Sequence, residues 1–208
     1  MKSYLSITIL ILVLVITACD NNKNSLTGSN TNTIVGTGSV VSDTINLAAF
    51  NSVKNLASFN VQITKGSPQQ VVLKAQQNIL DVVTYQVNNE ELLLGLQNNV
   101  SIQTPYGLNA EITVPEITRV GVIGAGDFDL SGTPQGVLYI DIIGVGNVRA
   151  YNLTVDTCYI TTTGVGDCYV RVNNLLNVLI AGVGHVYYKG NPSIISNITG
   201  VGSIVDDN

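Results

Sequence analysis

The chain carries little charge of either sign. Asp, Glu, Lys and Arg make up 11% of its 208 residues, against about 25% in an average domain. Its 9 basic residues are outnumbered by 14 acidic ones, and no stretch gathers the basic residues on one face. A nucleic-acid-binding surface needs a basic footprint, and an interfacial helix on anionic lipid needs a basic polar face. We therefore expect no nucleic-acid partner.

Histidine and cysteine are also scarce: His185 is the one histidine, and there are three cysteines. No His/Cys group has the spacing of a zinc site, so we expect no metal and no cofactor. Cys158 and Cys168 fall at apolar positions of their strands, where buried thiols behave as small hydrophobic side chains. A disulfide needs α-carbons within about 7 Å. The two cysteines occupy different positions of the pattern and are expected to be free thiols.

An apolar run near the start of the chain, Leu5 to Ala18, is too short for a spanning helix, which needs about 20 residues. It follows Lys2 and ends in Thr17-Ala18-Cys19, a pattern typical of an export signal. The ending resembles the bacterial lipobox. That resemblance implies cleavage before Cys19, lipid attachment to Cys19 and anchoring to a membrane of the bacterial cell envelope. An ordinary signal peptide is the alternative.

Residues 20–38 are rich in Asn, Ser, Thr and Gly and hold too few apolar side chains to offset the entropy of ordering. We interpret 1–18 as a lipoprotein signal peptide, 19–38 as a flexible tether and 39–208 as a single domain. The last stretch is long enough for one sizeable core. Val, Ile, Thr, Tyr and Gly dominate it while helix formers are scarce, which predicts an all-β protein.

A glycine phrase, Gly-Val-Gly or Gly-Ala-Gly, recurs in the second half of the chain. Its copies begin at Gly124, Gly144, Gly164, Gly182 and Gly200, and they are 20, 20, 18 and 18 residues apart. Apolar residues recur two, four and six positions before the first glycine and four positions after it. In the last copy these positions hold Ile198, Ser196, Ile194 and Ile204. Their alternation with polar residues is the signature of a strand with one buried face.

A unit of 18–20 residues cannot bury such a face alone, but stacked copies make a continuous core. The sequence therefore predicts an all-β fold with a parallel β-helix, or β-solenoid, of 18–20-residue coils in the C-terminal half and a less regular β region in the N-terminal half. Glycine suits the corner of each coil because it accepts positive φ and lets neighbouring coils approach closely.

Two known glycine-rich motifs do not fit the phrase. A dinucleotide-binding loop needs a third glycine where Arg149 and Tyr169 stand, and a helix after it. Calcium-binding β-rolls use shorter repeats that contain Asp. In this chain the second glycine of each copy is followed by Asp127, Asn147, Asp167, His185 or Ser203. Asn, Asp and Ser are ordinary turn residues, and we interpret this position as turn chemistry.

Two hairpins are expected in the N-terminal half. The strand that begins at Phe59 is followed by a turn at 66–68 and by a second apolar strand. The segment 82–97 repeats the pattern around Asn88 and Asn89.

The chain resembles a bacterial family. The resemblance rests on Phe50 and Val53, the Phe59-Val61-Ile63 strand, the segment from Ile112 to Pro115 and the run of glycine phrases. These features look like the "putative auto-transporter adhesin head GIN domain" family, over roughly residues 39–205. The resemblance implies a β-helix-like fold in exported or lipid-anchored envelope proteins. The family's name suggests adhesion, and the resemblance carries over no catalytic residues.

The catalytic alternative is a polysaccharide lyase, since β-helices host such enzymes. A lyase needs acids and a basic residue that converge on one face, and the acids and arginines of the repeats are scattered along the chain. His185 stands at the turn position, where a lone histidine is usually a surface residue. We therefore expect a non-catalytic envelope lipoprotein, an adhesin-like module that binds a glycan or an envelope protein. A structural role in envelope assembly is the other alternative.

Tyrosines mark the candidate binding site. The positions five residues before and five residues after the phrase face away from the core, and they hold Arg119, Tyr139, Tyr159, Arg149, Tyr169 and Tyr187. Adjacent coils lie about 4.8 Å apart, so the tyrosines are expected to pair side by side. Such pairs stabilise a sheet by about 0.2–1 kcal/mol each. Exposed phenols also offer a platform for a sugar chain or partner protein, and the two arginines would add hydrogen bonds to acidic groups.

Overall fold

Nearly all the regular structure is β-strand. The computed structural model describes residues 31–208, in which strands β1 to β17 accompany one four-residue helix, α1 (Gln77–Leu80). The prediction of an all-β protein is confirmed. No helix of this part of the chain is long and apolar enough to cross a membrane. The predicted signal peptide and the predicted lipidation site, Cys19, lie outside the described residues.

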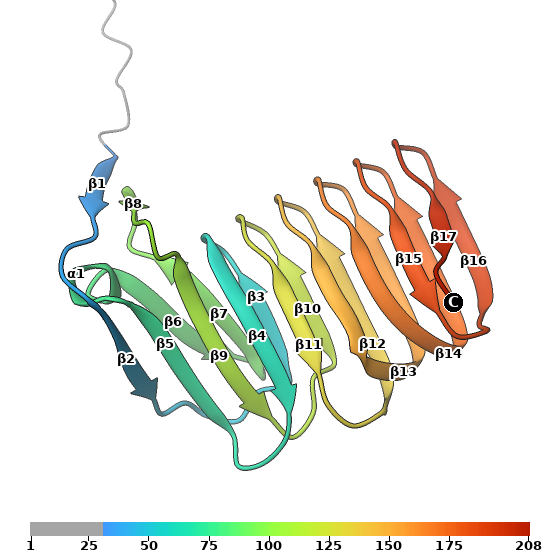
Figure 1. Cartoon of the computed structure of the whole chain (residues 1–208), viewed down its shortest axis with the longest axis horizontal. Helices are drawn as coiled ribbons and strands as arrows, with labels where there is room; N and C mark the ends of the chain where they lie inside the picture. The colour runs from blue at the N-terminus through green and yellow to red at the C-terminus, as the bar shows by residue number, and fades with distance from the viewer. Residues whose placement is uncertain (1–30) are drawn as a thin grey trace, which may run out of the picture. The chain divides into compact units, whose positions relative to one another are not determined.

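The strands form two sheets (Figure 1). Those of the N-terminal half are β1 (Asn32–Val35), β2 (Val40–Ile45), β3 (Ser52–Asn55), β4 (Phe59–Lys65), β5 (Gln70–Gln76), β6 (Val83–Asn88), β7 (Glu91–Leu96), β8 (Val100–Gln103) and β9 (Leu108–Val114). Those of the C-terminal half are β10 (Arg119–Val122), β11 (Phe128–Ser131), β12 (Gln135–Ile142), β13 (Val148–Thr162), β14 (Cys168–Ile180), β15 (Val186–Lys189), β16 (Ser193–Ile198) and β17 (Ile204–Asp206). β1 and β8 pair with each other, and the other strands make one 15-stranded sheet.

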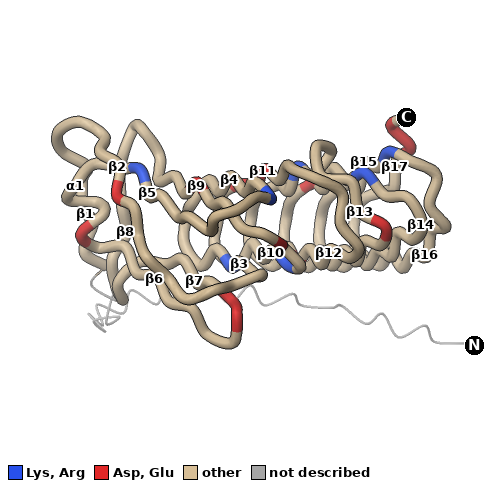
Figure 2. Tube along the Cα trace, turned by 90° about the horizontal axis from the view of Figure 1, so that it is seen from below, with Lys and Arg blue, Asp and Glu red and all other residues tan. Residues whose placement is uncertain are grey.

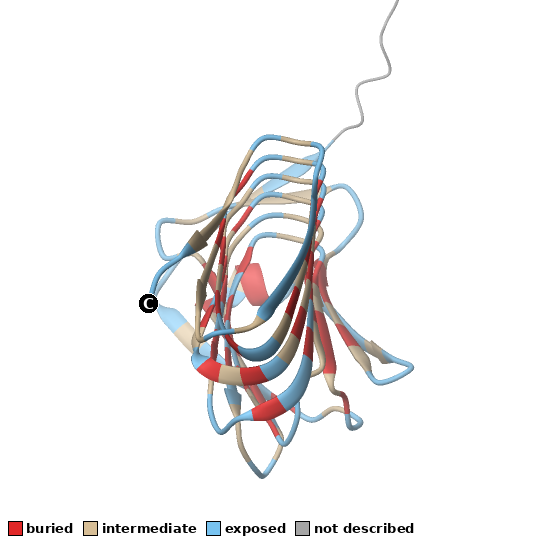
Figure 3. Cartoon of the chain, turned by 90° about the vertical axis from the view of Figure 1, so that its right-hand side faces the viewer, coloured by how far each residue is buried: buried red, intermediate tan, exposed pale blue. Residues whose placement is uncertain are grey.

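The large sheet curls into two walls that share the long strands β13 and β14. The β15 wall runs β2-β5-β9-β4-β11 and continues through the first residues of β13 and β14 to β15 and β17. The β16 wall runs β6-β7-β3-β10-β12 and continues through the later residues of β13 and β14 to β16. Buried residues line both walls in the end-on view (Figure 3), so the core lies between them.

Strand pairing from β10 to β17 is parallel throughout, and the middle residues of successive glycine phrases bridge one another. A Cβ atom built on Gly146 would overlap the carbonyl oxygen of Gly126, and one built on Gly164 would overlap that of Gly144. The phrase is glycine because the neighbouring backbone occupies the space that a side chain would need. The close approach expected from the sequence is confirmed.

The predicted core positions are buried in the inner copies of the pattern but exposed in the last one. Leu176 and Ile180 on β14 are fully buried, whereas Ile194 and Ile198, which pair with them on β16, are 42% and 40% exposed. Ser196 between them is also exposed. The prediction is wrong for this copy because β16 pairs only with β14 among the described strands, so that nothing covers its far side.

One of the two expected hairpins is absent and the other is present. β4 and β5 do not pair, because β9 lies between them, parallel to β4 and antiparallel to β5. β9 brings a face of four buried residues, Leu108, Ala110, Ile112 and Val114, and burial of that face favours a central position. β6 and β7 form the second hairpin as expected, with Asn89 and Glu90 at positive φ in its turn.

Part of the predicted tether is a strand. Residues 32–35, inside the predicted tether 19–38, form β1 and pair in parallel with β8. Thr33, Ile34 and Val35 are β-branched residues, which favour extended structure, and Ile34 packs against the core. The folded part therefore begins before residue 39.

Candidate functional site

The tyrosines predicted to pair do so on both walls. On the β16 wall, Tyr139 is in register with Tyr159, and their ring centroids lie 5.0 Å apart with planes 10° from parallel. On the β15 wall, Tyr169 is in register with Tyr187, with a separation of 4.9 Å and an angle of 6°. The predicted pairing is confirmed. The use of these tyrosines in binding stays a prediction.

Stacking determines which part of each ring a ligand can reach. The two rings of a pair cover each other's facing surfaces, and the guanidinium of Arg119 covers Tyr139 from the other side, 4.8 Å from the ring centroid. Burial raises the pKa of Tyr169, with a smaller contribution from the nearby carboxylate of Asp167, so this phenol keeps its proton at neutral pH. The tyrosine pairs therefore present mainly ring edges and hydroxyl donors to a ligand.

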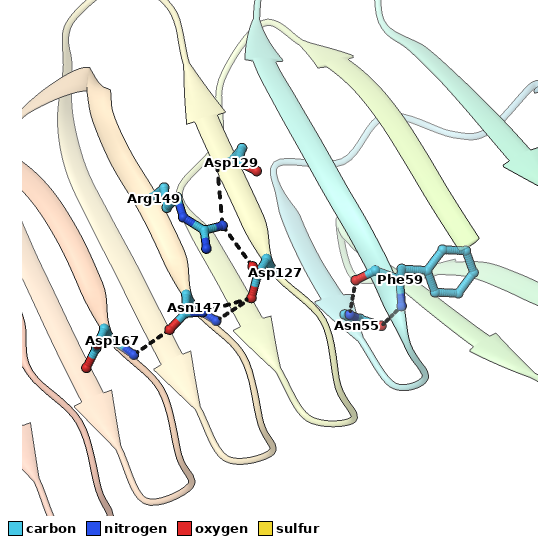
Figure 4. Close-up of polar contacts among 7 residues, drawn as sticks. All are labelled: Asn55, Phe59, Asp127, Asp129, Asn147, Arg149 and Asp167. Carbon is cyan, nitrogen blue, oxygen red and sulfur yellow. Dashed lines mark hydrogen bonds and ion pairs between the residues drawn. The ribbon is translucent and has the colours of Figure 1, made fainter. Parts of the chain in front are cut away.

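The two candidate arginines bind carboxylates of their own wall. Arg119 donates to Asp141 over 2.6 Å on the β16 wall. Arg149 donates to Asp127 over 2.8 Å, and Asp129 lies 3.8 Å from the same nitrogen (Figure 4). Each arginine thus already shares its charge with an acid. An acidic ligand group would have to compete with those carboxylates.

Side chains at the predicted turn position link successive glycine phrases. Oδ1 of Asp127 accepts the backbone N–H of Asn147 over 2.8 Å, and Oδ1 of Asn147 accepts that of Asp167 over 2.9 Å (Figure 4). Oδ1 of Asp167 accepts the N–H of His185 over 2.6 Å. Partial burial disfavours ionisation of Asp127, but the hydrogen bonds from Asn147 and Arg149 outweigh it and lower its pKa. These contacts support the interpretation of the position as turn chemistry.

A buried asparagine lies beside the first glycine phrase. The side chain of Asn55 is fully buried; it donates to the carbonyls of Phe59 and Ala125 and accepts the N–H groups of Ala57 and Phe59. It thereby holds the loop before β4 against the first glycine phrase. Nothing in its local sequence distinguished Asn55 from an ordinary turn residue.

A third tyrosine that the sequence analysis missed belongs to the β15 wall. Tyr151 meets Tyr169 edge to face, with centroids 5.7 Å apart, and its hydroxyl donates to Asp207 over 2.7 Å. The ammonium of Lys189 lies 5.0 Å from the Tyr151 ring centroid. Tyr151 stands seven residues after the first glycine of its phrase, a position held by Ser131, Arg171 and Lys189 in other copies, so it lies outside the columns that revealed the other tyrosines.

A surface hollow of about 660 Å³ lies on the same wall, over β9, β4 and β11. Its polar lining is Asn60, Gln62, Lys74, Asn109, Glu111, Asp129, Ser131 and Asn152. Lys74 and Glu111 form an ion pair there. Among the described residues, the exposed side-chain amides of Asn60, Gln62 and Asn152 have no hydrogen-bond partner within the protein.

The hollow and the tyrosines belong to one continuous outward column. Strand register joins in turn Glu111, Gln62, Asp129, Arg149, Tyr169, Tyr187 and Val205. At about 4.8 Å per strand, this column is about 29 Å long. We call these seven residues the outward column. It begins with polar groups, the ion-paired carboxylates of Glu111 and Asp129 and the unpaired amide of Gln62, and it leads to the stacked phenols.

The described residues offer no assembled catalytic or metal-binding group. No cluster of three or more His, Cys, Asp or Glu residues within 31–208 could hold a metal ion. His185 is exposed and contacts Asp167 and the Tyr187 ring. Cys158 and Cys168 are free and buried, as expected, and burial raises the pKa of both thiols. Charged positions are sparse along residues 31–208 of the trace (Figure 2).

Solved bacterial structures share the fold. One is a "putative adhesin" from Bacteroides fragilis, with a TM-score of 0.55 and 20% identity; the match covers 82% of this chain and 98% of that one. Another is a "putative lipid binding protein" from Parabacteroides distasonis, with a TM-score of 0.51 and 15% identity, covering 84% of this chain and 100% of that one. Identities this low establish the fold alone. No curated protein matches the chain.

A family model matches the sequence over residues 49–136 and 119–192. The two matches overlap and together cover more than half of the chain, including the loop held by Asn55, the polar lining of the hollow and both tyrosine pairs. The chain belongs to the family described as "Putative auto-transporter adhesin, head GIN domain".

Proposed function

We propose that the protein is a non-catalytic, adhesin-like binding module of the bacterial cell envelope, and that it binds an extended polar chain, a glycan, along the β15 wall. The observation that carries this proposal is the outward column, in which unpaired amides and ion-paired carboxylates in the hollow lead to stacked phenols. Carbohydrate sites combine hydrogen-bonding groups that match hydroxyls with aromatic side chains that offer a polar tip.

The proposal includes the architecture and the anchor. The parallel pairing of residues that are mostly 18 or 20 positions apart supports a β-solenoid for the part from β10 to β17. Its straight wall would present the ligand with equivalent groups at a regular spacing. The lipobox-like ending at Cys19 supports a lipid anchor on that residue, and membership of an adhesin-like family supports export to the envelope.

The β15 wall is favoured over the β16 wall by its extra groups. Both walls carry a tyrosine pair beside an arginine. Only on the β15 wall do a third tyrosine, Tyr151, and a hollow with unpaired amides adjoin the pair, within the described residues. From the sequence, both tyrosine pairs were expected to contact the ligand. We now propose that only Tyr169 and Tyr187 do so.

A glycan-binding screen on the full chain identifies a ligand. The affinity of protein variants for that ligand then tests the proposal. Tyr169→Ala with Tyr187→Ala, and separately Asn60→Ala with Gln62→Ala, should each weaken binding about tenfold, which corresponds to about 1.4 kcal/mol. Tyr139→Ala with Tyr159→Ala on the opposite wall is the matched control and should bind like the parent. If both β15-wall double variants also bind like the parent, the proposed site is wrong.

The lyase alternative receives less support from the geometry. The acids nearest to an arginine on the β15 wall, Asp127 and Asp129, are bound to Arg149. A lyase would shorten a polysaccharide over time, and size analysis of the ligand after prolonged incubation tests for that directly. We expect the ligand to keep its length.

A further inference from the structure

The C-terminal end of the large sheet has an edge that nothing covers within the described residues. β16 pairs only with β14, and β17 pairs only with β15. Each of these strands therefore leaves a row of backbone N–H and C=O groups unpaired, which is a template for another strand. At the opposite end of the sheet, α1 packs against β5 and β1, with Ile79 fully buried, but β2 and β6 are also edge strands, each paired on one side only.

The side chains of β16 are uncharged, and three of its six residues are isoleucines. Ile194, Ile195 and Ile198 of β16 are 42%, 56% and 40% exposed. No charged residue occurs from Gly190 to Val205, and β16 carries no coloured position in Figure 2. Proteins normally protect an exposed edge strand with lysine, proline or a bulge. β16 has none of these, and the strand is regular over its six residues.

We propose that β16 pairs with β16 of a second copy of this chain, in antiparallel orientation about a two-fold axis at Ser196. An uncharged edge can face itself without like-charge repulsion. A two-fold axis also makes the contact self-complementary and closed, so this contact gives a pair of chains and not a filament.

The side-chain pattern of β16 selects this register. Ile194, Ser196 and Ile198 face the core side, as shown by their buried partners on β14. An antiparallel partner keeps both inward faces on one side only if residues of the same parity lie opposite one another. With Ser196 opposite Ser196, each Ile194 faces Ile198 of the second copy. The exposed end of the core is then closed by isoleucine pairs.

Cross-linking of the full chain in detergent micelles tests the register. Ser196→Cys places two thiols opposite each other on the axis, so mild oxidation should give a covalent dimer with a 196–196 peptide identified by mass spectrometry. Gln86→Cys, an exposed position on the edge strand β6 at the other end of the sheet, is the matched control and should give no covalent dimer. Absence of the 196–196 link, or an equal yield from Gln86→Cys, would overturn the proposal.

Charge variants test the same contact without a cross-link. Ser196→Lys sets two ammonium groups opposite each other, and like charges directly opposite destabilise a strand pair, so the mass in analytical ultracentrifugation should fall from two chains to one. Ser193→Lys adds the same charge at the margin of the strand and should leave the dimer. Circular dichroism checks that both variants fold. A monomeric parent, larger assemblies of the parent, or equal loss in both variants contradicts pairing about Ser196.

Discussion

The rings of Tyr169 and Tyr187 lie parallel on adjacent strands, 4.9 Å apart, although 18 residues separate them in the chain. This relationship links stability to the proposed site, because the same contact that holds the two strands in register also orders the hydroxyl groups that a ligand would meet.

The Tyr169–Tyr187 contact should be measurable as a coupling free energy. In a double-mutant cycle with alanine at both positions, we expect an interaction of about 0.5–1.5 kcal/mol in the free energy of unfolding, as for other aromatic pairs. Urea denaturation provides the measurement. Tyr106, which is 59% exposed, should show no coupling with Tyr187. Additive effects of Tyr169→Ala and Tyr187→Ala would contradict the prediction.

Gly164 should not tolerate a side chain. A Cβ there would overlap the carbonyl oxygen of Gly144, so Gly164→Ala must push two neighbouring strands apart, and overpacking of this kind costs about 1–3 kcal/mol. Gly136→Ala is the matched control, because a Cβ at Gly136 has no neighbour within 4 Å. The thermal unfolding midpoint of Gly164→Ala should therefore lie below that of Gly136→Ala. Equal midpoints would contradict the prediction.

The carboxylate of Asp127 should stabilise the protein in a pH-dependent way. Its pKa in the folded state is lowered from 3.8, chiefly by hydrogen bonds from Asn147 and Arg149 that outweigh its partial burial. A lowered pKa means that the contribution is complete above the unfolded value and is lost as the pH falls through the folded value. The stability difference between the parent and Asp127→Asn should therefore shrink below about pH 3.8.

Measurement of unfolding midpoints from pH 7 down to pH 2.5 follows this difference. Asp129→Asn serves as the control, since Asp129 is 58% exposed and lies 3.8 Å from the arginine. A difference for Asp127→Asn that stays constant over the whole range would show that its charge plays no part.

Cys158 and Cys168 should be unreactive thiols in the folded protein. Both are completely buried, and burial raises the pKa of each, so the reactive thiolate is scarce and sheltered. Alkylation followed by mass spectrometry should label neither cysteine before denaturation and both after it. A peptide in which the two are linked, lighter by two hydrogens, would contradict the free-thiol state.

Cys19 should determine membrane association. If this residue carries the lipid, Cys19→Ser should release the protein or leave the precursor uncut, because each buried CH₂ of an acyl chain contributes about 0.8 kcal/mol to membrane binding. Fractionation of cells into soluble and membrane parts provides the measurement, with Ser29→Ala as a neighbouring control. Unchanged partitioning of Cys19→Ser would leave the anchor without support.

The sequence predicted the C-terminal half well because the interval between glycine phrases equals the offset between paired residues of neighbouring strands. Residues 20 apart, such as Tyr139 and Tyr159, lie side by side simply because each glycine phrase stacks on the previous one. The hollow could not be found in this way. Asn60 and Asn109 meet there through pairing of β4 with β9, and a local pattern of alternation does not reveal a partner 49 residues away.

The exposed isoleucines of β16 show a second limit of pattern analysis. Ile194 and Ile198 repeat the apolar positions of Leu176 and Ile180 and are indistinguishable from them in the sequence. Whether such a residue is buried depends on whether another strand follows, which is a property of the assembly and not of the local sequence. Tyr151 escaped notice because the equivalent positions of the neighbouring copies hold Ser131 and Arg171, so no column of tyrosines marked it.

The stacked glycine phrases have a consequence for how this protein can vary in size. Each phrase bridges only its neighbours along the stack, so removal of one complete interval, such as residues 144–163, would let the phrase at Gly164 stack on the phrase at Gly124. Removal of half an interval would set side chains against the backbone of the next strand. The length of such a molecule, and with it the length of each wall, can therefore change only in steps of one strand spacing.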